Sequence, residues 1–185
     1  MPELVDHAEA IAREFLAEAL PRRWTHVQAV AAKATSAASV LDEDDRAALV
    51  AAAWLHDVGY APSIVSSGLH ALDGARWLRD QGYPIRVANL VAYHSAAIFE
   101  ARERGLEDAL LHDFVDEASV VTDALCYCDM TTGPDGQTLD VLDRLDEVRQ
   151  RYGPDDVVTR FWRHAAEPTV EAVRRFEGLL AAQPM

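Results

Sequence analysis

Residues of the kinds that bind divalent metal ions recur at predicted helix ends and on apolar helix faces: His26, the adjacent pair His56–Asp57, His94 and Asp129. A buried carboxylate without a partner is costly, whereas imidazoles and carboxylates around a divalent cation satisfy one another. Side chains of adjacent helical residues diverge by about 100°, yet at a helix end both can bend toward one ion. The pattern therefore predicts a metal site in which His56 and Asp57 are joint ligands.

Asp123 competes with Asp129 for the last position in this set, because only six residues separate the two. They lie about 120° apart around a helix, so they face different neighbours. We prefer Asp129, for which capping or solvation of a helix end is the alternative. The remaining histidines lie outside the pattern and are expected to face solvent: His7, His112 and His164.

Two further histidines have simpler alternative interpretations. His94 shares a helical stripe with Val87, Leu90 and Val91, which turns it toward the interior, where ordinary packing competes with metal binding. His70 lies near a predicted helix start, where a solvent-facing side chain is the alternative. The presence of the His56–Asp57 pair favours ligation for His94, whereas for His70 the two interpretations stay open.

Three residues are candidates for contact with a substrate phosphate. Lys33 follows His26 by seven residues and lies on nearly the same helix face, although a salt bridge is its alternative use. Arg23, next to Arg22, lies just ahead of His26 and is otherwise part of an exposed helix start. Thr131 follows Asp129 closely and would line the mouth of a pocket unless it only begins a connecting turn.

Helical periodicity dominates the chain, and no stretch shows sustained apolar–polar alternation, so the sequence predicts an all-α fold. Asp42 and Asp45 form a capping pair, and Gly59 is expected to end the helix that carries His56. Pro168 and Gly153–Pro154 are expected to break the C-terminal part into two or three helices. The earlier helices are expected near residues 4–19, 23–38, 42–57 and 68–81, from Pro84 onward, and near 116–130.

The length suits a single domain spanning residues 1–185. A turn at Gly133–Gly136 is the one expected internal boundary. It would separate a core that carries the motifs, about residues 20–135, from a C-terminal helical cap, about residues 139–185.

The formal net charge of −14 opposes binding to nucleic-acid polymers or anionic membranes. A small phosphorylated substrate remains compatible, because a bound divalent cation reverses the field locally. The only cysteines, Cys126 and Cys128, point in different directions on a helix, so no disulfide is expected. With an acidic, amphipathic N-terminal segment and no long apolar run, we expect a cytoplasmic location. The sequence gives no indication of oligomeric state.

Three segments together resemble the HD superfamily of metal-dependent phosphohydrolases: Trp24-Thr25-His26-Val27, Trp54-Leu55-His56-Asp57-Val58-Gly59 and Tyr127-Cys128-Asp129-Met130. Their order and helical context match that family over roughly residues 20–135. The resemblance implies an HD-domain helical bundle with a C-terminal extension. It also implies that His26, His56, Asp57 and Asp129 bind the metal.

Two more segments are similar to motifs of HD branches with a binuclear site, among them bacterial diadenosine tetraphosphate hydrolases. These segments are His70-Ala71-Leu72-Asp73-Gly74-Ala75 and Tyr93-His94-Ser95. The similarity implies a second ion on His70 and His94, with Asp57 as the bridge. The chain departs from those branches at Tyr60, where many have lysine, and at Ser95-Ala96-Ala97, where they have a threonine-glycine run.

The expected activity is hydrolysis of a phosphoester or phosphoanhydride in a small, nucleotide-like substrate. Asp57, with His56 beside it, would be catalytic by orienting or deprotonating a water whose pKa a divalent ion lowers toward ~7. Mixed nitrogen and oxygen ligands suit one or two ions of Mn, Fe, Co, Ni or Zn. The alternatives are a non-catalytic HD module that binds a nucleotide or metal for regulation, and an HD-type oxygenase with a di-iron site.

Overall fold

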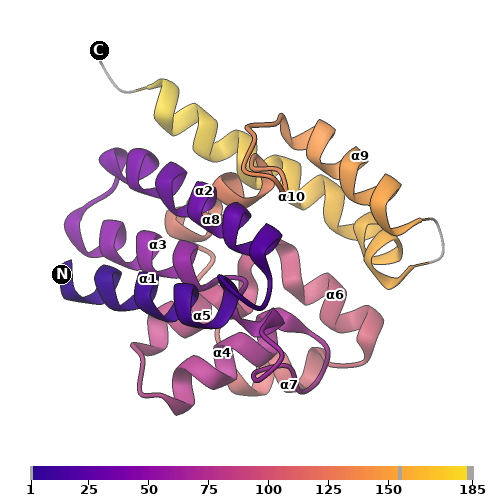
Figure 1. Cartoon of the computed structure of the whole chain (residues 1–185). Helices are drawn as coiled ribbons and strands as arrows, with labels where there is room; N and C mark the ends of the chain where they lie inside the picture. Colours follow the sequence, from indigo (N-terminus) through magenta and orange to yellow (C-terminus); the bar gives the residue numbers. More distant parts are fainter. Residues whose placement is uncertain (1, 154–155, 183–185) are drawn as a thin grey trace.

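The computed structural model describes residues 2–153 and 156–182, and its regular secondary structure is helical (Figure 1). This part of the chain has, besides helices, an isolated β-bridge between Thr132 and Thr138. The all-α prediction is therefore confirmed. The α-helices are α1 (Pro2–Leu16), α2 (Pro21–Ala37), α3 (Glu43–Leu55), α4 (His70–Asp80), α5 (Ile85–Tyr93), α6 (Ala97–Arg104), α7 (Glu107–Asp113), α8 (Val120–Met130), α9 (Val141–Tyr152) and α10 (Val157–Ala181).

Helix α3 is the central element of the bundle, because it packs against α1, α2, α5 and α8. Its middle residues Ala51, Ala52 and Ala53 are fully buried. Small side chains at these contacts let the neighbouring helices approach closely. The C-terminal end of α3, where His56 and Asp57 follow, is consequently enclosed by other helices.

The beginning of α3 confirms the predicted cap: the side chain of Asp42 accepts a hydrogen bond from the backbone N–H of Asp45 at 3.0 Å. The prediction that Gly59 ends this helix is wrong, because α3 already ends at Leu55. Gly59 lies within a short 3₁₀ helix, η2 (Val58–Tyr60), and a Cβ at this position would come within 1.9 Å of the carbonyl oxygen of His70. Gly59 is therefore needed for the close packing of η2 on α4, and that packing places His70 beside Asp57.

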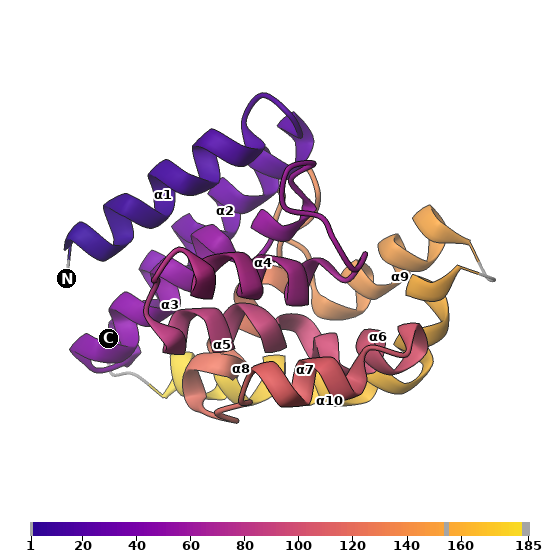
Figure 2. The same cartoon turned by 90° about the horizontal axis from the view of Figure 1, so that it is seen from below.

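Helices α9 and α10 form the described part of the C-terminal cap, and α9 lies far from α1 in both views (Figures 1 and 2). Helix α10 packs against α8, α6 and α9. Between the cap and the end of α8 is a second hydrophobic cluster, separate from the main core: Cys126, Met130, Val141, Leu145, Val148, Phe161, Trp162, Ala165 and Val173.

The predicted break at Pro168 is wrong, because α10 continues through it from Val157 to Ala181. A proline inside a helix costs about 3 kcal/mol. Packing of residues on both sides of Pro168, such as Ala165 and Val173, offsets this cost. The other predicted break falls after α9, which ends at Tyr152 before Gly153, while Pro154 lies outside the described residues.

Other boundaries differ from the prediction by a few residues. Helix α8 begins at Val120 rather than near Asp116, because Ser119 forms a capping box with Thr122. Helices α6 and α7 lie in a stretch for which no helix was predicted. No helix in the described ranges combines the length and the apolar character that crossing a bilayer requires.

Candidate metal centre

Three histidines of the predicted site are held by the same kind of hydrogen bond, from Nδ1 to a backbone carbonyl oxygen. Nδ1 of His26 donates to the carbonyl oxygen of Gly133 at 3.1 Å, that of His56 to Ala53 at 2.8 Å, and that of His94 to Val91 at 2.6 Å. A carbonyl partner at Nδ1 sets the tautomer of a neutral imidazole and leaves the lone pair on Nε2. All three rings thus present Nε2 to a common region.

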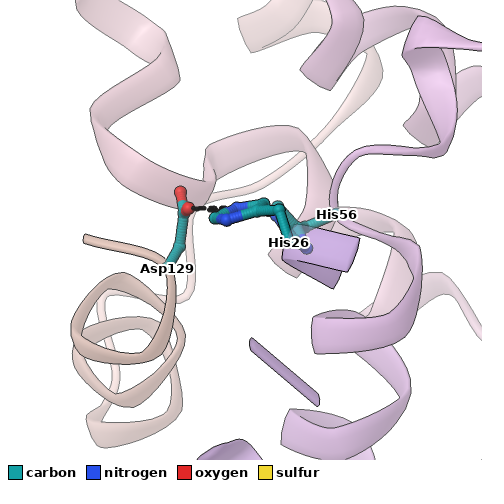
Figure 3. Close-up of side chains that lie close together, drawn as sticks. All are labelled: His26, His56 and Asp129. Carbon is teal, nitrogen blue, oxygen red and sulfur yellow. Dashed lines mark hydrogen bonds and ion pairs between the residues drawn. The ribbon is translucent and has the colours of Figure 1, made fainter. Parts of the chain in front are cut away.

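His26, His56 and Asp129 form the first group of ligand atoms (Figure 3). Nε2 of His26 lies 3.0 Å from Oδ1 of Asp129, and Nε2 of His56 lies 3.9 Å from the same oxygen. All three side chains are buried. They come from the second turn of α2, the end of α3 and the last turn of α8, so three separate helices define this group.

Asp57, His70 and His94 form the second group. Nε2 of His70 lies 3.1 Å from Nε2 of His94 and 3.6 Å from Oδ1 of Asp57. The other oxygen of Asp57, Oδ2, lies 3.5 Å from Nε2 of His56 in the first group. Asp57 therefore faces both groups with different oxygens, which is the placement required of a bridging carboxylate.

The protonation states favour metal binding at neutral pH. Burial lowers the pKa of His56 and, together with the neighbouring His94, lowers that of His70 well below its ordinary value. Burial alone would raise the pKa of Asp57, but the charge of Arg23 and the nearby histidines lower it. Neutral imidazoles and ionised carboxylates are the forms that metals bind.

Asp129 and His26 are tightly coupled. Burial would raise the pKa of Asp129, but the hydrogen bond from His26 and the surrounding imidazoles hold it well below its ordinary value. For His26, burial opposes protonation, yet the hydrogen bond to Asp129 and the charge of Asp57 raise its pKa. The raised pKa favours a proton shared between His26 and Asp129 in the absence of a cation, and metal binding would displace that proton.

The residues fit one or two divalent ions. Within each group the ligand atoms lie within 4.8 Å of one another, whereas ligands ~2.0–2.2 Å from one ion are at most about 4.4 Å apart, so only small shifts are needed. His56 Nε2 is buried and has no hydrogen-bond partner among the described residues. A buried polar atom without a partner is costly, and coordination would remove that cost.

Arg23 contacts Asp57, which faces both groups. Its Nη1 forms an ion pair with Oδ2 of Asp57, and its guanidinium lies 3.5 Å from the ring centroid of Tyr60. Tyr60 in turn stacks on His70 with ring centroids 4.0 Å apart. The tyrosine that replaces the lysine of similar branches thus supports both the predicted substrate contact Arg23 and a candidate ligand.

Lys33 and Thr131, also predicted as substrate contacts, bind each other instead. Nζ of Lys33 donates to the carbonyl oxygen of Thr131 at 2.6 Å and to its hydroxyl at 2.7 Å. Neither residue lines the cavity above the metal-binding groups. Lys33 satisfies the carbonyl group of Thr131 at the C-terminal end of α8, so its effect on the site is to position Asp129.

Sequence reasoning missed Ser95. Its hydroxyl donates to Oδ2 of Asp129, which orients the carboxylate from the side opposite His26. Ser95 and Ala96 have left-handed backbones, with φ of 47° and 61°, a conformation that costs non-glycine residues energy. The unusual Ser95-Ala96-Ala97 segment after His94 was the available signal.

The Gly133–Gly136 turn also contributes to the site, since its first carbonyl oxygen fixes His26. The competing residue Asp123 instead pairs with Arg175 at 2.7 Å. The histidines expected to face solvent are exposed: His7, His112 and His164.

A cavity of about 420 Å³ opens above the two groups. His26, Asp57, His70, His94 and Asp129 line one part of it. Other parts are lined by Arg22 and Arg23, by Glu100, and by residues of the C-terminal cap. A cavity of this size is within the range that holds small-molecule ligands.

Comparison with known proteins gives one match. Residues 23–124, more than half of the chain, match the family model of the HD domain. No curated protein and no solved structure matches the chain at a significant level. The matched segment contains His26, His56, Asp57, His70 and His94 and ends five residues before Asp129.

Proposed function

The chain belongs to the HD-domain family, and we propose that it is a metal-dependent phosphohydrolase acting on a phosphoester or phosphoanhydride of a small, nucleotide-like substrate. The observation that carries this proposal is the convergence of four histidines and two aspartates at a cavity that also contains Arg23. That combination supplies ligands for cations and a guanidinium for an anionic substrate in one place.

The chain's own residues have distinct roles in this proposal. Arg23 would bind phosphoryl oxygens through its planar guanidinium, which the ring of Tyr60 keeps in place. Asp57 would orient the attacking water or accept its proton, because its carboxylate is ionised and lies between the two groups. His56, fixed by Ala53, would add its unpartnered Nε2 to the ligands that Asp57 and Asp129 provide on either side of it.

A divalent ion held by these residues would supply positive charge for the phosphoryl oxygens and a water of lowered pKa. Histidine and carboxylate ligands suit Mn, Fe, Co, Ni or Zn. Metal analysis of the purified protein should therefore find such an ion. Supplying each metal in turn should restore phosphate release from nucleotides or other phosphomonoesters.

The change Asp57→Asn tests the proposal most directly. It keeps the shape of the side chain but removes the charge that binds cations and accepts a proton. We expect phosphate release to fall by roughly 10²–10⁴-fold, the range of a positioned acid–base group. Circular dichroism should show an unchanged helix content. The matched control is His7→Ala, an exposed histidine outside the site, which should leave activity and metal content unchanged.

The outcomes separate the proposal from its alternatives. Full activity in Asp57→Asn would contradict the phosphohydrolase mechanism. Nucleotide binding without turnover by any metal-loaded form would favour a regulatory module. Iron-dependent oxygen consumption would favour a di-iron oxygenase.

A further inference from the structure

The cavity has a second wall that the family match does not cover. The HD-domain match ends at residue 124, whereas α9 and α10 belong to the C-terminal cap. Each of these helices presents one face to the cavity: the α9 residues are three or four positions apart, and the α10 residues are Val158 and, one turn later, the adjacent pair Phe161–Trp162. These residues are Arg144, Val148 and Arg151 from α9 and Val158, Phe161 and Trp162 from α10.

Much of this wall is apolar and aromatic. Phe161 and Trp162 have ring centroids 4.8 Å apart and interplanar angle 35°, and both are buried in the second hydrophobic cluster with Val148. That cluster includes Met130, next to the candidate ligand Asp129. Met130 also lines the cavity. A flat apolar group would therefore find a matching surface beside the metal-binding groups.

Arg144 is the polar exception within this wall. It is only 8% exposed, and its Nε is buried without a hydrogen-bond partner among the described residues. The Nη1 of Arg144 forms an ion pair with Glu147. The other carboxylate oxygen of Glu147, Oε1, lies 3.4 Å from Nε of Arg151. A buried donor without a partner is rare in proteins because it is costly. Neighbouring atoms cover this Nε, so an acceptor on a bound molecule would satisfy it once the side chain turns toward the cavity that Arg144 lines.

The surroundings of Arg144 define the chemistry of that acceptor. A second phosphate placed there would lose its water beside apolar side chains and would lie close to the negative carboxylate of Glu147. A carbonyl oxygen or ring nitrogen avoids both costs. The fitting group is therefore uncharged and planar, with an acceptor on its edge, as in a nucleobase.

We propose that the wall formed by α9 and α10 is the subsite for the non-phosphorylated part of the substrate. In this subsite Arg144 is a specificity-determining residue that donates from Nε to an uncharged planar group. The inference rests on the proposed phosphohydrolase function for the position of the phosphate, at Arg23 and the metal-binding groups. It adds that the cap, rather than the matched domain, selects among phosphorylated compounds.

The test compares substrates with and without a base. The metal-loaded protein is assayed with the four common ribonucleoside 5′-monophosphates and with ribose 5-phosphate, which lacks the planar group. We expect at least one nucleoside monophosphate to be preferred about tenfold or more in kcat/KM. Arg144→Met, which keeps the apolar stem, should raise KM for that substrate about tenfold, the effect of losing one charge-assisted hydrogen bond, with little change in kcat. Hydrolysis of ribose 5-phosphate should be unaffected.

Two further variants control for folding. Arg149→Met changes an exposed arginine of the same helix, which pairs with Asp146 at 3.0 Å and does not line the cavity. It should behave as wild type. Arg144→Lys keeps a positive charge beside Glu147 but has no Nε–H in the same position. It should therefore show the same rise in KM as Arg144→Met, with a melting temperature close to wild type.

A binding measurement separates this inference from the proposed function. Calorimetric titration of the metal-free protein with each of the four common ribonucleosides, which have no phosphate, should give binding of at least one that Arg144→Met weakens about tenfold. If no compound releases phosphate but this weakening is seen, the phosphohydrolase function fails and the subsite stands. Equal hydrolysis of all five compounds, or equal effects of Arg149→Met and Arg144→Met, would overturn the subsite.

Discussion

Among individual residues, the orientation of the histidines is the property that makes this site suited to metal. His26, His56 and His94 each use Nδ1 on a backbone carbonyl, so backbone positions fix the ring planes before any ion arrives. Asp57 then faces ligands of both groups. Such outer contacts raise metal affinity because they remove the freedom that binding would otherwise cost.

The geometry predicts two bound ions, and the first ligand group can hold its ion without the second. His26, His56 and Asp129 suffice for one ion, whereas His70 and His94 contribute only to the second group with Asp57. Protein prepared in excess metal should contain close to two equivalents. The double change His70→Ala, His94→Ala should retain about one, as measured by elemental analysis after desalting.

The control for that count is a pair of exposed histidines. The double change His112→Ala, His164→Ala should leave the stoichiometry at two, since both side chains face solvent. A wild-type protein that never exceeds one equivalent would assign His70 and His94 to substrate binding or packing instead.

Among the elements, Arg86 joins three segments that enclose the site. From α5, its Nη2 contacts Asp45 of α3 at 2.6 Å, and its Nε contacts Glu117, just ahead of α8, at 2.9 Å. Burial would raise the pKa of Glu117, but hydrogen bonds from Arg86 and Ser119 lower it below its ordinary 4.5. The pKa of Arg86 is raised, mainly by its hydrogen bond to Glu117.

This network predicts a pH-dependent contribution to stability. A carboxyl whose pKa is lowered by folding stabilises the protein above its unfolded pKa and loses that effect as the pH falls through its folded value. Glu117→Gln should therefore lower the free energy of unfolding by on the order of 1 kcal/mol at pH 7, because Arg86 is partly screened by solvent. The difference should shrink as the pH falls below the ordinary carboxyl pKa of 4.5 and through the lower pKa of the folded state.

Urea titrations at pH 7 and pH 3.5 measure this difference. The control is Asp80→Asn, which breaks an exposed pair with Arg79 and should change stability by less than about 0.5 kcal/mol at either pH. If Glu117→Gln lowers the free energy of unfolding equally at both pH values, the contribution of Glu117 comes from the shape of its side chain and not from its charge.

The elements also show what the sequence alone could predict. The cap at Asp42, the helix ends carrying His56 and Asp129, and the all-α class follow from local patterns, and the structure agrees with them. The break predicted at Pro168 is absent, because packing on both sides of it offsets the local cost of a proline inside a helix. The pairing of Lys33 with Thr131 joins residues 98 positions apart, so no local pattern signals it.

At the scale of the whole molecule, arginines from distant parts of the sequence meet at the cavity. The chain carries −14, yet four arginines line the cavity: Arg22, Arg23, Arg144 and Arg151. They come from the start of α2 and from α9, which are more than a hundred residues apart in sequence. Asp57, Glu100 and Asp129 line the same cavity, so its charges are mixed until bound cations offset the carboxylates. The arginines of α9 belong to the cavity only when the C-terminal cap is packed against the core.

The last prediction follows from the assembly of the site out of α2, α4, α8 and the ends of α3 and α5. No short segment of the chain contains a complete ligand group, so an ion binds the folded protein far better than the unfolded one. At a metal concentration one hundred times Kd, binding stabilises the fold by ~2.7 kcal/mol, which for a chain of this length is a rise in melting temperature of about 5–10 °C. Chelation should reverse that rise without unfolding the protein at room temperature, because Arg23 balances Asp57 and His26 balances Asp129 when no ion is bound. Thermal melts after verified chelation and after metal is restored measure the shift. Asp129→Asn removes a ligand of the first group only, so metal should raise its melting temperature less than that of the wild type. A wild-type melting temperature that does not change on chelation would mean that the clustered residues bind no ion.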